Sequence, residues 1–382
     1  MTDAPILVTG ALGNVGGATV TALLHRGERV RAADLDTDAL AQRFPDAEAV
    51  RLDFLDPTTF EPALAGCRAL FLLRPPPISR VKPTLNRLID VAAQRGLVEH
   101  VVFSSVEGAD TNTIVPHHRV ETHLRASALP WTILRPGFFA QNLTDAYRLD
   151  IRDDHRLYVP AAHGRVAFID VADLGKVAAT VFTDPTPHTG QGYTLTGPEA
   201  LTFDQVADLL TQALDTPIRY QPAPIAGYLR HLHQRGLPLA MIAVQTILHV
   251  GLRRGDAETV APTTQQLLGR PATPLADFIA THTDRWRLVG KVVGRATSSG
   301  EPSRGGAPQG LGGVRHAGVA SRCGCRRRRG WLSAPHGDSG GPAVASGGCA
   351  AQVIPERIEH AHAASRSYSA TRVSPSSSVR CP

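Results

Sequence analysis

Three glycines near the start of the chain have the spacing of a phosphate-binding loop. Gly10, Gly13 and Gly16 follow an apolar run at residues 6–8, and a stretch with helical periodicity comes after them. In such a loop the first glycine turns the chain out of a strand, the second lets the backbone approach a pyrophosphate, and the third lets helix and strand pack closely. The N–H groups and the dipole at the start of the helix then attract phosphate. The residues expected to form this dinucleotide site are Thr9, Gly10, Leu12, Gly13, Asn14, Val15 and Gly16.

An acid ends the second apolar run, where the adenosine ribose of a bound dinucleotide would lie. The Asp34 carboxylate can accept hydrogen bonds from the ribose hydroxyls, and it repels a 2′-phosphate. The expected cofactor is therefore NAD(P)H, with NADH slightly favoured over NADPH. Asp36 competes for the same role, and both acids are alternatively loop residues.

Further candidates follow the later strands, at the edge where a parallel sheet binds its ligands. Asp53 would lie beside the adenine, although a carboxylate in a turn is an equal alternative. Ser105 would contact the nicotinamide or the substrate, and a buried capping serine is the equal alternative. The residues expected to extend the cofactor site are Asp53, Phe54, Leu73, Arg74, Pro75, Ser104 and Ser105.

Short apolar runs alternate with helix-length amphipathic stretches through the first half of the chain. The runs show little polar alternation, which is typical of parallel strands covered on both faces. We predict strands at residues 5–9, 29–33, 49–52, 69–73, 100–104 and 131–135. We predict helices at residues 15–26, 37–43, 58–64, 81–95 and 118–127. Right-handed crossovers between these elements give an α/β fold with a doubly wound, Rossmann-type parallel sheet.

The pattern changes twice along the chain, which predicts three parts. Residues 1–150 form the NAD(P)-binding domain. Residues 151–288 form a smaller, mainly helical lobe that caps the substrate, with some strands returning to the large sheet. Its helical stretches lie at residues 170–182, 203–214, 225–234, 237–252 and 274–285. Residues 289–382 are a basic tail rich in Gly, Ser, Arg and Pro, and we expect disorder there because such a segment cannot bury enough apolar area.

Charge and cysteine are both concentrated in the tail. The whole chain has a net charge of +6, but residues 287–382 hold 14 Lys and Arg against 4 Asp and Glu, so the rest is net acidic. The basic character is a property of the tail, and we expect no nucleic-acid partner. Cys67 is the one cysteine before the tail, which fits a reducing, cytoplasmic location. The charge-free stretch at residues 236–252 contains polar side chains, so we expect a pocket-lining or core helix rather than a membrane span.

Four segments together resemble the NmrA-like family of atypical short-chain dehydrogenases. They are residues 9–16, the strand end at 101–105, the sequence LPWTILRPGFF at 129–139, and YTLTGPE at 193–199. The resemblance is closest to the branch of NAD(P)H-dependent quinone and dye reductases, and it spans residues 5–286. It implies an oxidoreductase that uses NAD(P)H. Because the family also contains cofactor-sensing regulators without turnover, a non-catalytic NAD(P) sensor that binds a protein partner is the alternative.

The chain departs from ordinary short-chain dehydrogenases at their Tyr–Lys pair. His117 takes the place of the tyrosine, and Glu121 takes that of the lysine. A carboxylate does not lower the pKa of a neighbouring acid as an ammonium does, so we do not expect alcohol dehydrogenation. Hydride transfer to a quinone-like or other planar apolar acceptor depends less on a strong proton donor in the protein, because the acceptor delocalises the negative charge that it receives. The protein then mainly orients the reactants in a dry pocket.

His117 is the candidate catalytic residue, as a proton donor to the substrate or as its hydrogen-bond partner. An imidazole titrates in a suitable range, and a histidine at the surface or at a helix N-terminus is the alternative. Phe138 and Phe139 follow a strand end and are either core packing or pocket lining. We expect no metal, since the histidines around position 117 lack a metal-binding spacing. The residues expected to contact a small apolar substrate are Pro76, His117, Glu121, Phe138, Phe139 and Asn142.

Overall fold

The apolar runs of the first half build a seven-stranded parallel sheet. In the computed structural model, which describes residues 4–287, the strand order is β3-β2-β1-β4-β5-β6-β9, and every neighbouring pair is parallel. The strands are β1 (Ile6–Thr9), β2 (Val30–Asp34), β3 (Glu48–Arg51), β4 (Ala69–Leu73), β5 (His100–Ser104), β6 (Trp131–Pro136) and β9 (Gln191–Leu195). The predicted α/β fold with a doubly wound, Rossmann-type sheet is confirmed.

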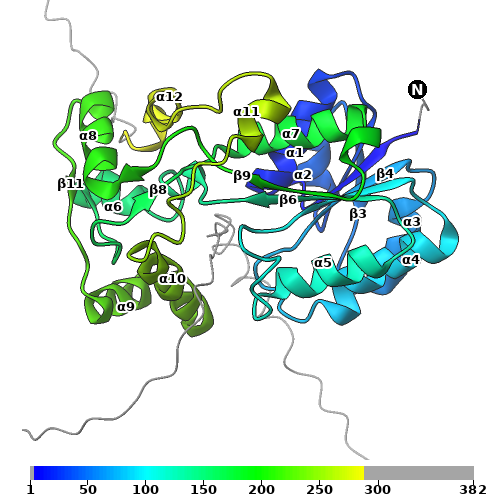
Figure 1. Ribbon diagram of the computed structural model, residues 1–382, viewed down its shortest axis with the longest axis horizontal. Coiled ribbons are helices and arrows are strands. Elements are labelled where there is room, and N and C mark those ends of the chain that lie inside the picture. The colour runs from blue at the N-terminus through cyan, green and yellow to red at the C-terminus, as the bar shows by residue number, and fades with distance from the viewer. Residues whose placement is uncertain (1–3, 288–382) are drawn as a thin grey trace, which may run out of the picture. The chain divides into compact units, whose positions relative to one another are not determined.

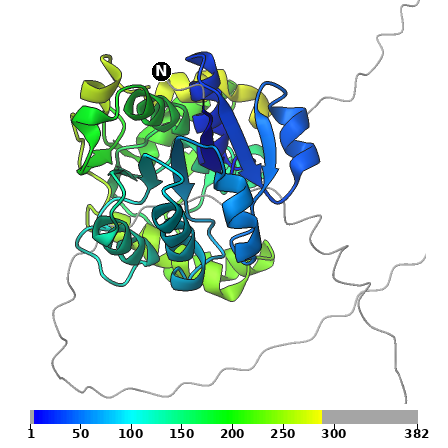
Figure 2. The same cartoon turned by 90° about the vertical axis from the view of Figure 1, so that its right-hand side faces the viewer.

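Helices cover both faces of the sheet, as Figures 1 and 2 show. One layer holds α1 (Asn14–His25), α2 (Thr37–Arg43), α7 (Val171–Thr183) and α11 (Thr263–Leu268). The other holds α3 (Phe60–Leu64), α4 (Arg87–Arg95) and α5 (Pro116–Ala126). Neighbouring residues of a strand point to opposite faces, so Ile6 and Val8 of β1 are buried in the core under the first layer and Leu7 in the core under the second.

The chain beyond β6 builds a smaller lobe around a core of its own. Its helices are α6 (Arg148–Asp154), α8 (Phe203–Leu214), α9 (Ile225–Gln234), α10 (Leu239–Leu252) and α12 (Leu275–Thr281). Two short strand pairs join them: β7 (Arg156–Leu157) with β11 (Arg219–Tyr220), and β8 (Arg165–Val166) with β10 (Leu201–Thr202). Aliphatic side chains make up most of this core, and several aromatic rings pack among them. The last of these rings, Trp286, donates its indole N–H to the Leu143 carbonyl at 2.9 Å.

The elements differ from the prediction mainly at their ends. The stretch expected as one helix at residues 81–95 begins as a π-helical turn, η2 (Lys82–Asn86), before α4. Helix α5 begins at Pro116 rather than at residue 118, because proline suits the first turn of a helix. The element α7 and the strand β9 lie after residue 150 yet belong to the large sheet layers, and the domain boundary at 150 stays a prediction.

Two expectations concern the limits of the chain. The disorder expected for residues 289–382 falls outside the described residues. Among residues 4–287, no helix has the length and apolar character needed to cross a membrane.

Candidate dinucleotide and substrate site

The strand order reverses direction at β1, which gives the sheet a topological switch point between β1 and β4. From β1 the chain moves outward through β2 to β3, and it then returns to the other side of β1 as β4. At such a point the loops leaving the two neighbouring strands diverge, and ligands bind between them in open α/β sheets. The sequence-predicted cofactor residues follow the ends of β1, β2, β3, β4 and β5, so the fold gathers them at this edge.

The glycine loop is closely packed, most of all at Gly10 and Gly16. Gly10 has a φ of +62°, and a side chain there would place its first carbon 2.8 Å from the Leu73 Cδ1 atom. A side chain on Gly16 would come within 2.2 Å of the Gly10 carbonyl oxygen. Gly13 is less confined, since its first side-chain carbon would lie 3.3 Å from that oxygen. Gly10 and Gly16 are thus needed for the turn itself, while Gly13 keeps the mouth of the loop open.

The first turn of α1 is free to meet an anion. Gly13 caps the helix without any side-chain hydrogen bond, and no acid lies in the first turn. The first N–H groups of a helix have no partner within the helix, so they can donate to phosphate oxygens. The loop and helix therefore fit a dinucleotide diphosphate.

Two side chains of the loop have structural partners. The Thr9 hydroxyl donates to the Phe71 carbonyl at 3.1 Å and accepts from the Leu73 N–H at 3.1 Å, which fastens β1 to β4. The Asn14 amide donates to Asp145 at 2.7 Å and so links the loop to the segment after β6. Both side chains therefore already have hydrogen-bond partners within the protein.

Asp34 is fixed at the end of β2 by backbone donors. Its carboxylate accepts the Leu12 N–H at 3.0 Å and the Leu35 N–H at 2.8 Å. Arg43 donates to the Leu12 carbonyl at 2.6 Å, and Arg51 donates to the Leu35 carbonyl at 3.1 Å. An acid and two guanidinium groups therefore frame the place where the adenosine ribose would lie.

The residues after β3 serve the local turn and the core. Asp53 accepts the Leu55 N–H at 2.9 Å and faces Arg51 at 3.3 Å. Phe54 is buried, with its ring edge-on to Phe60 at 6.5 Å between centroids. This geometry favours the turn carboxylate that was the alternative for Asp53, and it places Phe54 in the core. Asp36, the competitor of Asp34, caps α2 by accepting the Ala39 N–H.

The proline-rich loop after β4 is joined to His117. Arg74 Nε donates to His117 Nε2 at 3.2 Å, and Arg74 Nη1 donates to the carbonyls of Pro75, Pro76 and Ile78. Burial lowers the pKa of Arg74 to about 10. Since His117 Nε2 accepts this bond, a proton on the ring is carried by Nδ1. The histidine is 4% exposed and is the second residue of α5, so it is not at the surface but does match the helix N-terminal position given as the alternative.

Glu121 lies in a buried ion-pair network. Its carboxylate accepts both Nε (3.0 Å) and Nη2 (2.8 Å) of Arg135, the Ser105 hydroxyl at 2.6 Å and Arg125 Nη2 at 3.0 Å. Only 1% of the residue is exposed. Four donors leave this carboxylate little capacity for a substrate, so the geometry favours a structural role for both Glu121 and Ser105 over the expected contacts.

Two other predicted residues carry buried polar atoms that lack a partner. The Ser104 hydroxyl and the Asn142 side-chain nitrogen have no hydrogen bond within the described part of the chain. Ser104 points to the opposite face of β5 from Ser105, toward the layer of α1 and α7. A buried polar atom without a partner costs free energy, and a bound ligand can satisfy it.

The two phenylalanines after β6 belong to different cores. Phe138 is fully buried in the small lobe, edge-on to Phe168 at 5.5 Å and to His249 at 5.9 Å. Phe139 is buried in the sheet core. Both positions match the core packing considered for them, with Phe138 on the side of the small lobe.

One acid at the carboxyl edge of the sheet, Glu107, was not predicted from the sequence. Glu107 lies two residues after Ser105 in the loop that leaves β5, and burial raises its pKa to about 7. The only signal in the sequence was its place shortly after a strand end. Its burial depends on Gly137, which is distant in the chain.

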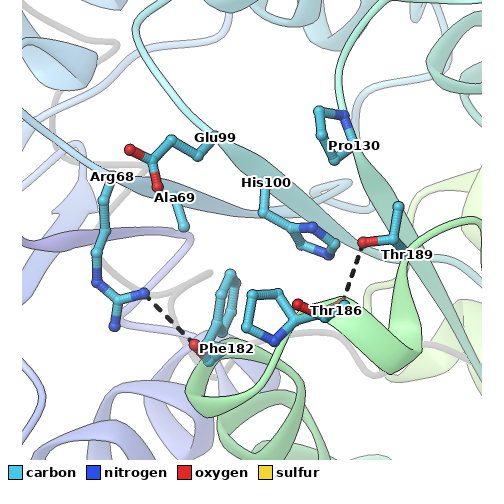
Figure 3. Close-up of a pocket in the computed structure, with 9 residues that line it drawn as sticks. Arg68, Ala69, Glu99, His100, Pro130, Phe182, Thr186 and Thr189 are labelled. Carbon is cyan, nitrogen blue, oxygen red and sulfur yellow. Dashed lines mark hydrogen bonds between the residues drawn. The ribbon is translucent and has the colours of Figure 1, made fainter. Parts of the chain in front are cut away.

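A separate cavity of about 240 Å³ lies at the opposite edge of the sheet (Figure 3). It is lined by residues at the amino ends of β4, β5 and β6, among them Ala69, His100 and Pro130. His100 is held by the Thr132 hydroxyl at 2.9 Å, and burial lowers its pKa to about 4. Because ligands of such sheets bind at the carboxyl ends, this cavity is not part of the candidate site.

A family model and several known reductases match this chain. The NmrA-like family matches residues 2–264. An NAD(P)H azoreductase of Xenophilus azovorans is 30% identical over 284 residues, which cover 72% of this chain and 97% of that protein. A (4-alkanoyl-5-oxo-2,5-dihydrofuran-3-yl)methyl phosphate reductase of Streptomyces griseus is 31% identical over 285 residues, covering 73% and 98%.

A similar structure is the NADPH-dependent quinone oxidoreductase of Escherichia coli in complex with NADPH. It has a TM-score of 0.66 and 25% identity, covering 72% of this chain and 99% of that one. The resemblance inferred from the four sequence segments is confirmed. The chain belongs to the NmrA-like family.

Proposed function

We propose that this protein is an NAD(P)H-dependent oxidoreductase that transfers a hydride to a quinone-like or other planar apolar acceptor. The observation that carries the proposal is the glycine loop at the switch point of the sheet, with an uncapped helix start behind it. The azoreductase and quinone oxidoreductase relatives, which align over nearly their full lengths, support the reaction class.

The nucleotide would lie along the carboxyl edge of the sheet. The diphosphate would accept hydrogen bonds from the first N–H groups of α1, and the adenosine ribose hydroxyls would donate to the Asp34 carboxylate. Ser104 and Asn142 supply buried polar atoms to the nicotinamide end, where NAD(P)H when bound provides the hydride. Residues 151–288 cap the substrate, and we place the protein in the cytoplasm.

The acceptor would lie beside the loop after β4 and the start of α5. Arg74 keeps a positive charge close to this position, which favours negative charge developing on the acceptor. His117, held by Arg74, is a hydrogen-bond partner for the acceptor. The prolines of the loop stiffen it and help to exclude water.

The cofactor preference follows from the fixed Asp34 carboxylate. We infer a slight preference for NADH, because Asp34 repels a 2′-phosphate while Arg43 and Arg51 already donate to backbone carbonyls. Calorimetric titration with NADH and NADPH tests this inference. Equal or tighter binding of NADPH rejects the preference and leaves the reductase function standing.

The reaction is tested by stopped-flow oxidation of NADH and NADPH with a panel of small quinones and an azo dye. We expect cofactor-dependent turnover with at least one planar acceptor. Cofactor binding in the micromolar range without turnover of any acceptor would instead support the sensor that binds a protein partner.

A further inference from the structure

The Glu107 carboxyl lies at the carboxyl ends of three adjacent strands. A side chain at position 137 would place its first carbon 3.0 Å from Glu107 Oε2, so the carboxyl rests against Gly137, directly after β6. The same point is 3.6 Å from the Leu195 carbonyl oxygen and 3.6 Å from Thr196 Cγ2, at the end of β9. The Glu107 N–H donates to the Pro136 carbonyl at 3.0 Å, which fixes the loop after β5 on β6.

This carboxyl has no counter-ion. Within residues 4–287 its side chain makes no hydrogen bond or ion pair, and it is only partly buried, so it stays open to a ligand. Arg135 of β6 is held by Glu121 and lies 3.8 Å from Asp110, the other acid of the loop. His118 of α5 is bonded to a carbonyl of the same loop, and the end of β9 contributes no titratable side chain.

A carboxyl in this setting holds its proton near neutral pH. Burial without a compensating charge raises the pKa of Glu107 to about 7, which matches the operating range of a general acid. Glu121 is the contrasting acid of the same edge, because four donors surround it. The two carboxyls therefore have different roles.

We propose that Glu107 is the proton donor of the reduction, an inference that rests on the proposed function. A hydride from NAD(P)H adds to the quinone and leaves NAD(P)⁺ and the hydroquinone anion. The Glu107 carboxyl gives its proton to the anionic oxygen, so that the hydroquinone leaves neutral. The Glu107 carboxylate then takes a proton from water before the next turnover.

The test compares Glu107→Gln with wild type and with Asp110→Asn, which removes one acid from the same loop. The measurement is the pH profile of kcat/KM from pH 5.5 to 9, with 2-methyl-1,4-naphthoquinone and saturating NAD(P)H. We expect wild-type kcat/KM to fall as pH rises through about 7, since the protonated acid is the active form. Glu107→Gln should lower the rate by about 10²-fold and remove this pH dependence, while Asp110→Asn keeps both.

Cofactor affinity separates this inference from the proposed function. NAD(P)H should bind Glu107→Gln as tightly as wild type. A wild-type enzyme that turns over, together with a Glu107→Gln variant of equal rate and pH profile, overturns the proton-donor role alone. No wild-type turnover with any acceptor overturns both.

A second variant covers the case in which the glutamine variant does not fold. Glu107→Asp keeps a carboxylic acid, so it should retain the pH dependence at a lower rate. If Glu107→Asp has the wild-type kcat/KM and this value does not depend on pH, the proposal is contradicted.

Discussion

At the scale of single residues, the three loop glycines are not equivalent. Gly16 lies so close to the Gly10 carbonyl that even a methyl group cannot enter, whereas Gly13 faces the mouth of the loop. A spacing rule treats them alike, but in the structure Gly16 is confined by backbone much more tightly than Gly13. This difference gives a sharp test of the nucleotide site.

Gly13→Ala should weaken NAD(P)H binding at least tenfold and leave the melting temperature nearly unchanged. The added methyl lies where the diphosphate must approach the backbone. Gly16→Ala should cost about 3 kcal/mol or more in stability, because it forces a backbone shift. Calorimetric titration and thermal unfolding of both variants distinguish the roles, and an unchanged affinity in Gly13→Ala would refute the site.

At the scale of elements, a buried ion pair fixes α5 to β6. The Arg135 guanidinium meets Glu121 through two parallel hydrogen bonds, with side chains 7% and 1% exposed. Arg125, one turn further along α5, approaches the same carboxylate from solvent with 39% of its side chain exposed. The network positions the start of α5, and with it His117, against the sheet.

Glu121→Gln should destabilise the protein by about 3–5 kcal/mol, because it leaves the Arg135 charge buried without its partner. Arg125→Ala removes only an exposed partner and should cost less than about 1 kcal/mol. Urea denaturation measures both. A similar small loss in the two variants would show that the buried pair is not a main source of stability.

At the scale of the whole molecule, two buried histidines connect stability with pH. His100 lies in the sheet and His249 in the core of the small lobe, where it is bonded to Tyr147. Burial lowers the pKa of each to about 4. Both histidines stay neutral in the folded protein at pH values where the unfolded chain binds protons.

The free energy of unfolding should therefore fall as pH drops from about 6.5 toward 4. Between these limits the unfolded state binds more protons, and each histidine contributes up to about 1.4 kcal/mol per pH unit. Urea denaturation at pH 7.5, 6 and 5 measures the slope. His100→Asn should reduce it by about one proton, and an equal slope in the variant contradicts the assignment to His100.

The sequence by itself determined the fold class and the place of the glycine loop. Both depend on short-range patterns. One is the spacing of Gly10, Gly13 and Gly16, and the other is the apolar runs, which lack the polar alternation of strands with one face in solvent. These patterns act within one strand–turn–helix unit, so no distant residue is needed to recognise them.

Only the tertiary structure decided which partners the acids and the histidine at the sheet edge have. Glu121 is engaged because β6 brings Arg135 beside it, and His117 accepts from Arg74 across 43 positions of the chain. Glu107 packs against Gly137, and its burial there raises the pKa of its carboxyl to about 7. The charge and protonation of a side chain depend on burial and on partners from distant segments, and local sequence carries neither quantity.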